Sequence, residues 1–316
     1  MSQATLRILS PDEAGLSEAV GILQQGGLVS FPTETVYGLG ADARNDRAVA
    51  GIFAAKGRPS FNPLIVHVAD LETAAKYVDF NDTAERLAAN FWPGPLTLVL
   101  PLRTDEGISK LVTAGLDSLA VRVPDHSLAQ GLLRRFAGPV AAPSANPSGR
   151  VSPTSAAHVI AGLGNEIDAV VDGGDCRVGL ESTIVSCIGA PALLRAGGIP
   201  AERIEDCLGA LLRLPDDPQT PMAPGQLASH YAPAGSVRLN ANAAQDGEFL
   251  LGFGPVEADL NLSPSGDLTE AAARLFACLH ALDKVGATAI AVSPIPHHGL
   301  GRAINDRLRR AAAPRG

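Results

Sequence analysis

The chain has 316 residues, of which 46% are hydrophobic and 18% are charged, and its formal net charge at pH 7 is −8. This composition excludes a disordered protein, because the chain carries enough apolar surface to offset the entropy lost on folding. The negative charge argues against broad nucleic-acid binding, which needs Lys and Arg to neutralise phosphates. The sequence shows no secretory signal and no apolar run near the roughly 20 residues that cross a bilayer. We therefore expect a cytoplasmic globular protein.

Helix-like and strand-like patterns alternate along the first 212 residues. Apolar residues at helical spacing over 16–23 end at the pair Gly26-Gly27, and a capping Asp46 begins a second helix that runs to Lys56. Short apolar runs rich in β-branched residues predict strands at 28–31, 64–68, 96–100, 119–123, 140–142, 169–171 and 183–186. This alternation predicts an α/β domain with a twisted, at least partly parallel sheet.

The composition changes at a proline-rich stretch, with prolines at 215, 218, 221, 224 and 233. Such a stretch cannot continue a helix or an inner strand, so we interpret it as a linker. After it come a predicted strand at 249–253, a long helix at 268–285, a strand at 289–292 and a helix from about Arg302. The predicted organisation is a domain over 1–212, a linker over 213–236 and a small α/β domain over 237–316.

Three nucleotide-binding or metal-binding signatures are incomplete. The run 38–43 fits G-x-G-x-x-A but lacks the acidic residue that holds a ribose, so we interpret it as a turn. Gly174 and Gly179 have phosphate-loop spacing, but Leu180 stands where the lysine is needed. The four cysteines show no metal-site spacing and are expected to be buried.

Cations and hydroxyls at strand and helix ends are the remaining signal. Arg122 lies within an apolar strand and therefore needs an anionic partner, which Glu34 or Glu181 would supply internally. Lys56 and Arg58 either form a binding site or complement a helix dipole, and a lone strand histidine such as His67 is more often a core residue than a ligand contact. Together these groups suit the binding of two anions side by side, as in nucleotidyl transfer.

The motifs carry a family resemblance. The runs 32–39 (PTETVYGL), 56–59 (KGRP), 62–64 (NPL), 144–146 (SAN) and 181–185 (ESTIV) resemble the YrdC-like threonylcarbamoyl-AMP synthases, and 230–233 (HYAP) with 299–308 (GLGRAINDRL) resemble their longer two-domain form. The resemblance implies a YrdC-like twisted mixed sheet domain with a smaller C-terminal Rossmann-like α/β domain. It also implies that L-threonine, bicarbonate or CO2 and ATP are joined into L-threonylcarbamoyladenylate with release of pyrophosphate, for N6-threonylcarbamoyladenosine in tRNA.

The resemblance also assigns residues. Threonine would be held by Thr35, His67, Arg122, Ala142 and Ser182. ATP would be held by Lys56, Arg58, Asn62, Ser118, Ser144, Asn146, Ser152, Arg195 and Tyr231, with Lys56 and Arg58 as the catalytic cations. Mg2+ would accompany the triphosphate without a protein carboxylate cage, and the linker would close over the site as a lid.

The linker departs from the family at 225–229 (GQLAS), which carries fewer basic and aromatic residues than is usual, and Ala196 stands in place of a proline. The expected partners are the three substrates and a tRNA threonylcarbamoyltransferase complex that takes the product. Two alternatives are a carbamoyl-adenylate former related to the hydrogenase-maturation carbamoyltransferases and a non-catalytic RNA-binding module. For the latter, the arginines near the C-terminus would give a weak RNA contact, although we favour simple solvation of a helix; they are Arg302, Arg307, Arg309, Arg310 and Arg315.

Overall fold

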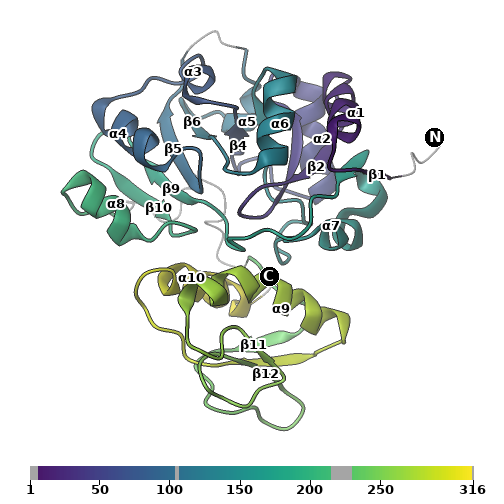
Figure 1. Cartoon of the computed structure of the whole chain (residues 1–316), viewed down its shortest axis with the longest axis vertical. Coiled ribbons are helices and arrows are strands. Elements are labelled where there is room, and N and C mark those ends of the chain that lie inside the picture. Colours follow the sequence, from purple (N-terminus) through teal and green to yellow (C-terminus); the bar gives the residue numbers. More distant parts are fainter. Residues whose placement is uncertain (1–5, 104–106, 215–229, 315–316) are drawn as a thin grey trace.

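The structure is a computed structural model that describes residues 6–103, 107–214 and 230–314. Two lobes are visible in it, each built around its own sheet (Figure 1). The predicted linker at 213–236 falls largely on residues 215–229, which lie outside the described residues. No helix among the described residues is long and apolar enough to span a membrane.

The larger lobe contains a ten-stranded mixed sheet in the order β1-β8-β2-β3-β7-β4-β6-β5-β9-β10. Parallel and antiparallel pairs alternate irregularly across it, with β4 parallel to β6 and β5 antiparallel to β6. The predicted mixed α/β sheet is therefore confirmed. The strands are β1 (Arg7–Leu9), β2 (Val29–Pro32), β3 (Tyr37–Asp42), β4 (Ile65–His67), β5 (Leu96–Pro101), β6 (Ser118–Arg122), β7 (Val140–Ala141), β8 (Ala169–Val171), β9 (Thr183–Ser186) and β10 (Ala192–Arg195).

Helices cover the sheet, and most begin at a side chain that caps their first turn. Asp12 accepts a hydrogen bond from the amide of Gly15, and Asn45 accepts from Arg47 and Ala48, which satisfies amides that have no partner within the helix. The helices of this lobe are α1 (Glu13–Gln24), α2 (Asp46–Lys56), α3 (Leu71–Ala74), α4 (Asp82–Phe91), α5 (Lys110–Thr113), α6 (Ser127–Phe136), α7 (Ala156–Leu163), the 3-10 turn η1 (Gly164–Glu166) and α8 (Ala201–Leu208).

One predicted turn is a strand. The glycine-rich run 38–43, interpreted above as a turn, forms most of β3, which pairs with β2 and β7. The glycines are needed by the packing: a Cβ on Gly40 would lie 2.8 Å from the ring of Phe31, and one on Gly38 would lie 3.3 Å from the Cβ of Ala142. Small residues in a strand mark close approach of neighbouring groups, and the turn interpretation is wrong.

The smaller lobe has a parallel four-stranded sheet in the order β11-β14-β12-β13, as expected for a Rossmann-like unit. Its two helices lie on the side of the sheet that faces the larger lobe (Figure 1). An apolar cluster joins the lobes, because Val36, Val151 and Leu180 of the larger lobe pack with Leu275 and Phe276 of the smaller. The elements are β11 (Ser236–Arg238), β12 (Phe249–Gly252), β13 (Leu260–Asn261), α9 (Leu268–Lys284), β14 (Ala289–Val292) and α10 (Gly301–Ala312).

Candidate functional site

A polar cavity lies in the larger lobe where the ends of several strands meet. The predicted residues that line it come from β4, β6 and β10, from the loops beside β2, β7 and β9, and from the segments after α2 and before β11. They are Thr35, Arg58, His67, Arg122, Ala142, Ser144, Ser182, Arg195 and Tyr231. Thr33, Val36, Gly38, Ile65, Pro143, Glu181 and His230 complete the lining. Residues far apart in the chain are thus brought to one edge of the sheet, where α/β folds place ligands.

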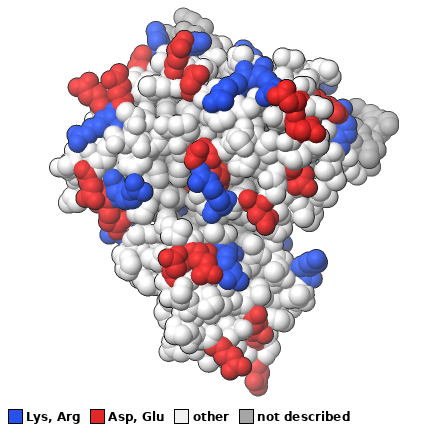
Figure 2. All heavy atoms as spheres, viewed as in Figure 1, with Lys and Arg blue, Asp and Glu red and all other residues white. Residues whose placement is uncertain are grey.

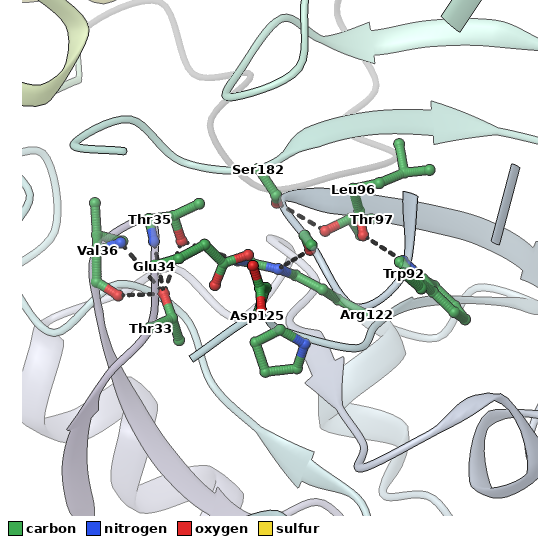
Figure 3. A network of polar contacts seen from close by, with 12 residues as sticks. Thr33, Glu34, Thr35, Val36, Trp92, Leu96, Thr97, Arg122, Asp125 and Ser182 are labelled. Atoms are coloured by element: carbon green, nitrogen blue, oxygen red, sulfur yellow. Dashed lines mark hydrogen bonds and ion pairs between the residues drawn. The ribbon is translucent and has the colours of Figure 1, made fainter. Parts of the chain in front are cut away.

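The turn after β2 is locked by its own hydroxyl. Thr33 Oγ1 donates to the carbonyl of Val36 at 2.7 Å and accepts from the amides of Thr35 and Val36. This turn directs Glu34 and Thr35 toward Arg122, as Figure 3 shows. The ion pair between Arg122 Nη2 and Glu34 Oε1 measures 2.6 Å, and both side chains are buried. Of the two partners predicted for Arg122, Glu34 is the one found.

Arg122 is oriented on three sides. Its Nε donates to the carbonyl of Gly94 at 3.1 Å, its Nη1 donates to Thr35 Oγ1 at 3.0 Å, and its Nη2 faces Glu34. A guanidinium carries five N–H groups in a rigid plane. These three contacts leave N–H groups for a ligand in the cavity, and a planar carboxylate is the anion whose geometry matches them best.

Arg195 and Ser182 form another part of the lining. The Nε and Nη2 of Arg195 donate to the carbonyl of Ser182 at 3.1 and 2.9 Å, and Nη2 also donates to the Ser182 hydroxyl. That hydroxyl lies 2.7 Å from Thr97 Oγ1 (Figure 3). Burial and neighbouring cations lower the pKa of Arg195, which also lies close to Glu181. Arg122 and Arg195 therefore place two guanidinium groups on one cavity.

The two cations at the C-terminal end of α2 have different positions. Arg58 lines the cavity and is held by the carbonyls of Asn62 and Pro63, which accept from its Nε and Nη2. Lys56 does not line the cavity: its Nζ donates to the carbonyl of Ser144 at 2.6 Å and to that of Asn146. Lys56 is therefore a buried anchor of the 144–146 loop in this conformation, and neither cation simply complements the helix dipole.

Burial sets the protonation of the cationic and imidazole groups. It lowers the pKa of Lys56 well below the usual value, with a smaller contribution from Arg58, and it lowers the pKa of Arg58 to about 10. Burial and then Arg122 lower the pKa of His67 to about 3, so its imidazole is neutral near pH 7. His67 Nδ1 has no hydrogen-bond partner among the described residues. It is both a core residue and a cavity residue.

The other predicted ATP residues are buried beside the cavity, with one exception. Asn146 donates through Nδ2 to the carbonyls of Pro147 and Arg150, and Ser152 Oγ donates to Glu181 Oε1 at 2.5 Å. Asn62 supplies the carbonyl that accepts from Arg58. Ser118 begins β6, at the opposite end of that strand from Arg122, and is not part of the lining. The structure does not bring it to the other predicted residues.

His230 and Tyr231 line the cavity from the segment that enters the smaller lobe. Tyr231 has a positive φ of 61° and is fully enclosed, with its ring 5.7 Å from that of Phe276. The amide of His230 donates to the carbonyl of Arg310 at 3.2 Å, and the amide of Ala232 donates to the carbonyl of Gly149 at 2.8 Å. The pair therefore contacts both lobes.

Sequence reasoning missed a second buried ion pair. Arg307 of α10 is expected from its position to be solvated with the other C-terminal arginines, but it is 1% exposed and its Nε lies 2.8 Å from Glu181 Oε2. Arg302 pairs with Glu202 and Arg310 with Asp306, while Arg315 lies outside the described residues. On the face in Figure 2, basic side chains lie beside acidic ones. The apolar spacing of 303, 304, 308 and 311 places 307 on the same helix face, which was the available signal.

The cavity offers few groups that could ligate a metal. Among the described side chains, no three from His, Cys, Asp and Glu cluster closely enough to hold an ion. Glu181, which lines the cavity, and Glu34, which pairs with the lining residue Arg122, each form an ion pair with an arginine at 2.8 Å or less. A cation in this cavity would therefore be held by oxygens that a ligand brings with it.

Comparison with known proteins matches both lobes. Residues 21–197 match a family described as "Telomere recombination" (Sua5, YciO and YrdC), and residues 199–313 match one described as "Threonylcarbamoyl-AMP synthase, C-terminal domain". The threonylcarbamoyl-AMP synthase of Pyrococcus abyssi is 41% identical over 94% of each chain, and that of Bacillus subtilis is 40% identical over 97% of this chain and 95% of the other.

Solved structures agree. The crystal structure of P. abyssi Sua5 complexed with L-threonine superposes with a TM-score of 0.89 at 38% identity and covers 98% of both chains. The match to Escherichia coli YciO covers 61% of this chain and 96% of the YciO chain, with a TM-score of 0.55 at 22% identity. The match to full-length HypF covers 58% of this chain and 29% of the HypF chain, with a TM-score of 0.52 at 21% identity. At those identities YciO and HypF share the fold only.

Proposed function

Because the chain belongs to the threonylcarbamoyl-AMP synthase family, in its two-domain form, we propose that it joins L-threonine, bicarbonate or CO2 and ATP into L-threonylcarbamoyladenylate. The reaction is a nucleotidyl transfer that releases pyrophosphate. The product supplies the threonylcarbamoyl group for N6-threonylcarbamoyladenosine in tRNA, which a separate transferase complex installs in the cytoplasm. The observation that carries the proposal is the convergence of Arg58, Arg122 and Arg195 on one cavity.

L-Threonine fits the wall made by β6 and the turn after β2. Its carboxylate would accept from the remaining N–H groups of Arg122, and the Thr35 and Ser182 hydroxyls would orient it. His67, neutral near pH 7, offers Nδ1 to the amino or hydroxyl group. The amine then captures CO2 as a carbamate, whose oxygen attacks the α-phosphorus of ATP, so the substrate supplies the nucleophile.

ATP fits the wall that carries Arg58, Ser144 and Arg195. The two guanidinium groups would face phosphate oxygens and stabilise the charge that develops as pyrophosphate leaves. Lys56 would act through the 144–146 loop whose carbonyls it holds. Mg2+ would enter on the triphosphate, because Glu181 of the lining and the neighbouring Glu34 are each paired with an arginine.

The domain assignment follows the same reasoning. We propose that residues 1–212 form the catalytic domain, that 213–236 form a linker that covers the site, and that 237–316 form a domain that holds this linker. The contacts of His230 and Tyr231 with both lobes support this division. With those two residues seated, the cavity is screened from water, which protects a carbamate and an acyl adenylate from hydrolysis.

The test is substrate-dependent pyrophosphate release. The purified chain should release pyrophosphate from ATP only when L-threonine and bicarbonate are both present, and mass spectrometry should find threonylcarbamoyl-AMP. Equal release without either substrate contradicts the proposal. Carbamoyl phosphate added in place of bicarbonate and threonine should give no adenylate, whereas a carbamoyl-adenylate former would accept it.

A further inference from the structure

The pair of Glu181 and Arg307 links the smaller lobe to the cavity. Arg307 projects from α10 and reaches three groups outside its helix: Nε lies 2.8 Å from Glu181 Oε2, Nη2 donates to the carbonyl of Ala196 at 3.0 Å, and the guanidinium carbon lies 4.9 Å from the centre of the Tyr231 ring. Its Nη1 donates to the adjacent Asp306. Every polar edge of this guanidinium is thus engaged, although it comes from a different lobe.

Glu181 lies between two arginines. One carboxylate oxygen pairs with Arg307, and the other accepts from Ser152 Oγ. Arg195, the cavity cation proposed to face ATP, lines the same cavity as Glu181, and the charge of each stabilises that of the other. The chain neighbour of Glu181, Ser182, gives its carbonyl to Arg195.

The Glu181 carboxylate therefore has two cations with which it can pair, Arg307 and Arg195. A buried carboxylate that loses its cationic partner has a high free-energy cost, which pairing with another nearby cation lowers. For Glu181 that cation is Arg195, which lines the same cavity. The other groups that face Glu181 are the hydroxyl of Ser152, the imidazole of His230 and the phenol of Tyr231. Burial lowers the pKa of His230 to about 3, which leaves that imidazole neutral near pH 7.

We propose that Arg307 is a positioning residue of the cavity: its ion pair with Glu181 prevents this carboxylate from forming a direct ion pair with Arg195, so that the Arg195 guanidinium stays directed at the nucleotide. The smaller lobe thereby completes the site that the larger lobe carries. This inference rests on the proposed function only in naming the ligand of Arg195 as ATP.

Replacement of Arg307 separates this role from a merely structural one. In Arg307→Met, Glu181 captures Arg195, so the KM for ATP should rise about tenfold while the KM for L-threonine stays within about twofold. Removal of the competing charge should suppress the defect, so Glu181→Gln/Arg307→Met should have an ATP KM within about threefold of that of Glu181→Gln alone. Arg307→Lys keeps a cation beside Glu181 and should stay within about threefold of the wild type.

Arg309→Met is the matched control, because Arg309 lies on the exposed side of the same helix. The inference is overturned if Arg307→Met changes the ATP KM no more than this control does, if Arg307→Lys is as impaired as Arg307→Met, or if the ATP KM of the double variant exceeds that of Glu181→Gln by more than about threefold. Where Arg307→Met shows no cooperative thermal transition, Arg307→Gln replaces it, since it keeps a polar head without the charge.

Hydrogen exchange of the full chain gives a readout that needs no turnover. Loss of the pair should speed exchange in peptides over 150–153 and 181–183 in Arg307→Met but not in Arg309→Met. A wild-type chain that releases no pyrophosphate overturns the proposed function, and faster exchange then still supports the pairing role. Unchanged exchange overturns that role whether or not the wild type is active.

Discussion

Charge burial at single residues explains how the cavity holds its shape before a ligand arrives. Arg122 and Glu34 are both almost fully buried, and each would be costly alone in a medium of low polarity. Pairing removes most of that cost, and the carbonyl of Gly94 and the hydroxyl of Thr35 fix the plane of the guanidinium. Arg122 is therefore pre-oriented, so that binding of a carboxylate needs little reorganisation.

His67 gives a prediction on pH dependence. Its pKa in the folded chain is about 3 because of burial and Arg122, whereas an unfolded histidine has a pKa near 6.5. Between these two pH values the unfolded chain binds one more proton than the folded chain. The contribution of His67 to the free energy of unfolding is therefore fully present above pH 6.5 and is lost as the pH decreases. His67→Gln removes this group and should lose about 2 kcal/mol less stability than the wild type between pH 7 and pH 5.

The check is urea unfolding of both chains at the two pH values. Burial also lowers the pKa of His158 to about 4 and that of His230 to about 3. These groups contribute equally to both chains and cancel in the difference. Equal losses in the two chains would show that His67 is already protonated in the fold at pH 5.

At the scale of elements, the sequence predicts the parts of the site that depend on local pattern. The ends of the strands over 64–68 and 119–123 and of the helix over 46–56 carry His67, Arg122 and Lys56, and each element is present in the structure. What could not be predicted depends on a neighbour distant in sequence. From the sequence alone, the glycines of β3 are typical of a turn. Only the structure shows that Gly40 is needed because the ring of Phe31 packs against it.

The prediction for Arg307 fails for the same physical reason. Its anionic partner lies 126 positions earlier in the chain, and a cation in the last turns of a helix is normally solvated or complements the dipole. Lys56 does lie at the predicted helix end, but its role differs, because its ammonium holds two loop carbonyls. Local pattern thus finds where charged groups lie, and only the packed chain shows which groups they meet.

Gly179 tests the contact between the loop before β9 and helix α9. It has a φ of +73°, and a Cβ there would lie 2.5 Å from backbone atoms of Ala272 and Ala273. Gly179→Ala should destabilise the chain by about 1–3 kcal/mol more than a strained backbone alone does, because two rigid elements must separate. Urea unfolding of the full chain measures the difference.

Gly174→Ala is the matched control for that substitution. Gly174 has a similar φ of +77°, but a Cβ added there would meet none of the described atoms within 4 Å, so only the backbone strain of about 1 kcal/mol is expected. Equal losses of unfolding free energy in Gly179→Ala and Gly174→Ala would mean that α9 does not pack tightly against the loop before β9. The comparison therefore isolates the packing of the two lobes at one point.

At the scale of the whole molecule, the two lobes form one working unit. The apolar cluster between them contains Val151 and Leu180 from one lobe and Leu275 and Phe276 from the other. The ion pair of Glu181 and Arg307 and the contact of His280 Nε2 with the carbonyl of Ser152 at 3.1 Å lie in the same interface. Since these contacts do not pass through the linker, association of the lobes should survive a break in it.

A protease site introduced at 216–224 tests this directly. After cleavage the two pieces should elute together in size-exclusion chromatography at micromolar concentration, with the larger lobe still folded. Turnover should fall about threefold to tenfold, because the segment that carries His230 and Tyr231 is then tethered at one end only and spends less time seated. The uncut chain with the same inserted site is the control. Separation of the pieces would contradict the shared interface, and unchanged turnover would contradict a covering role for the linker.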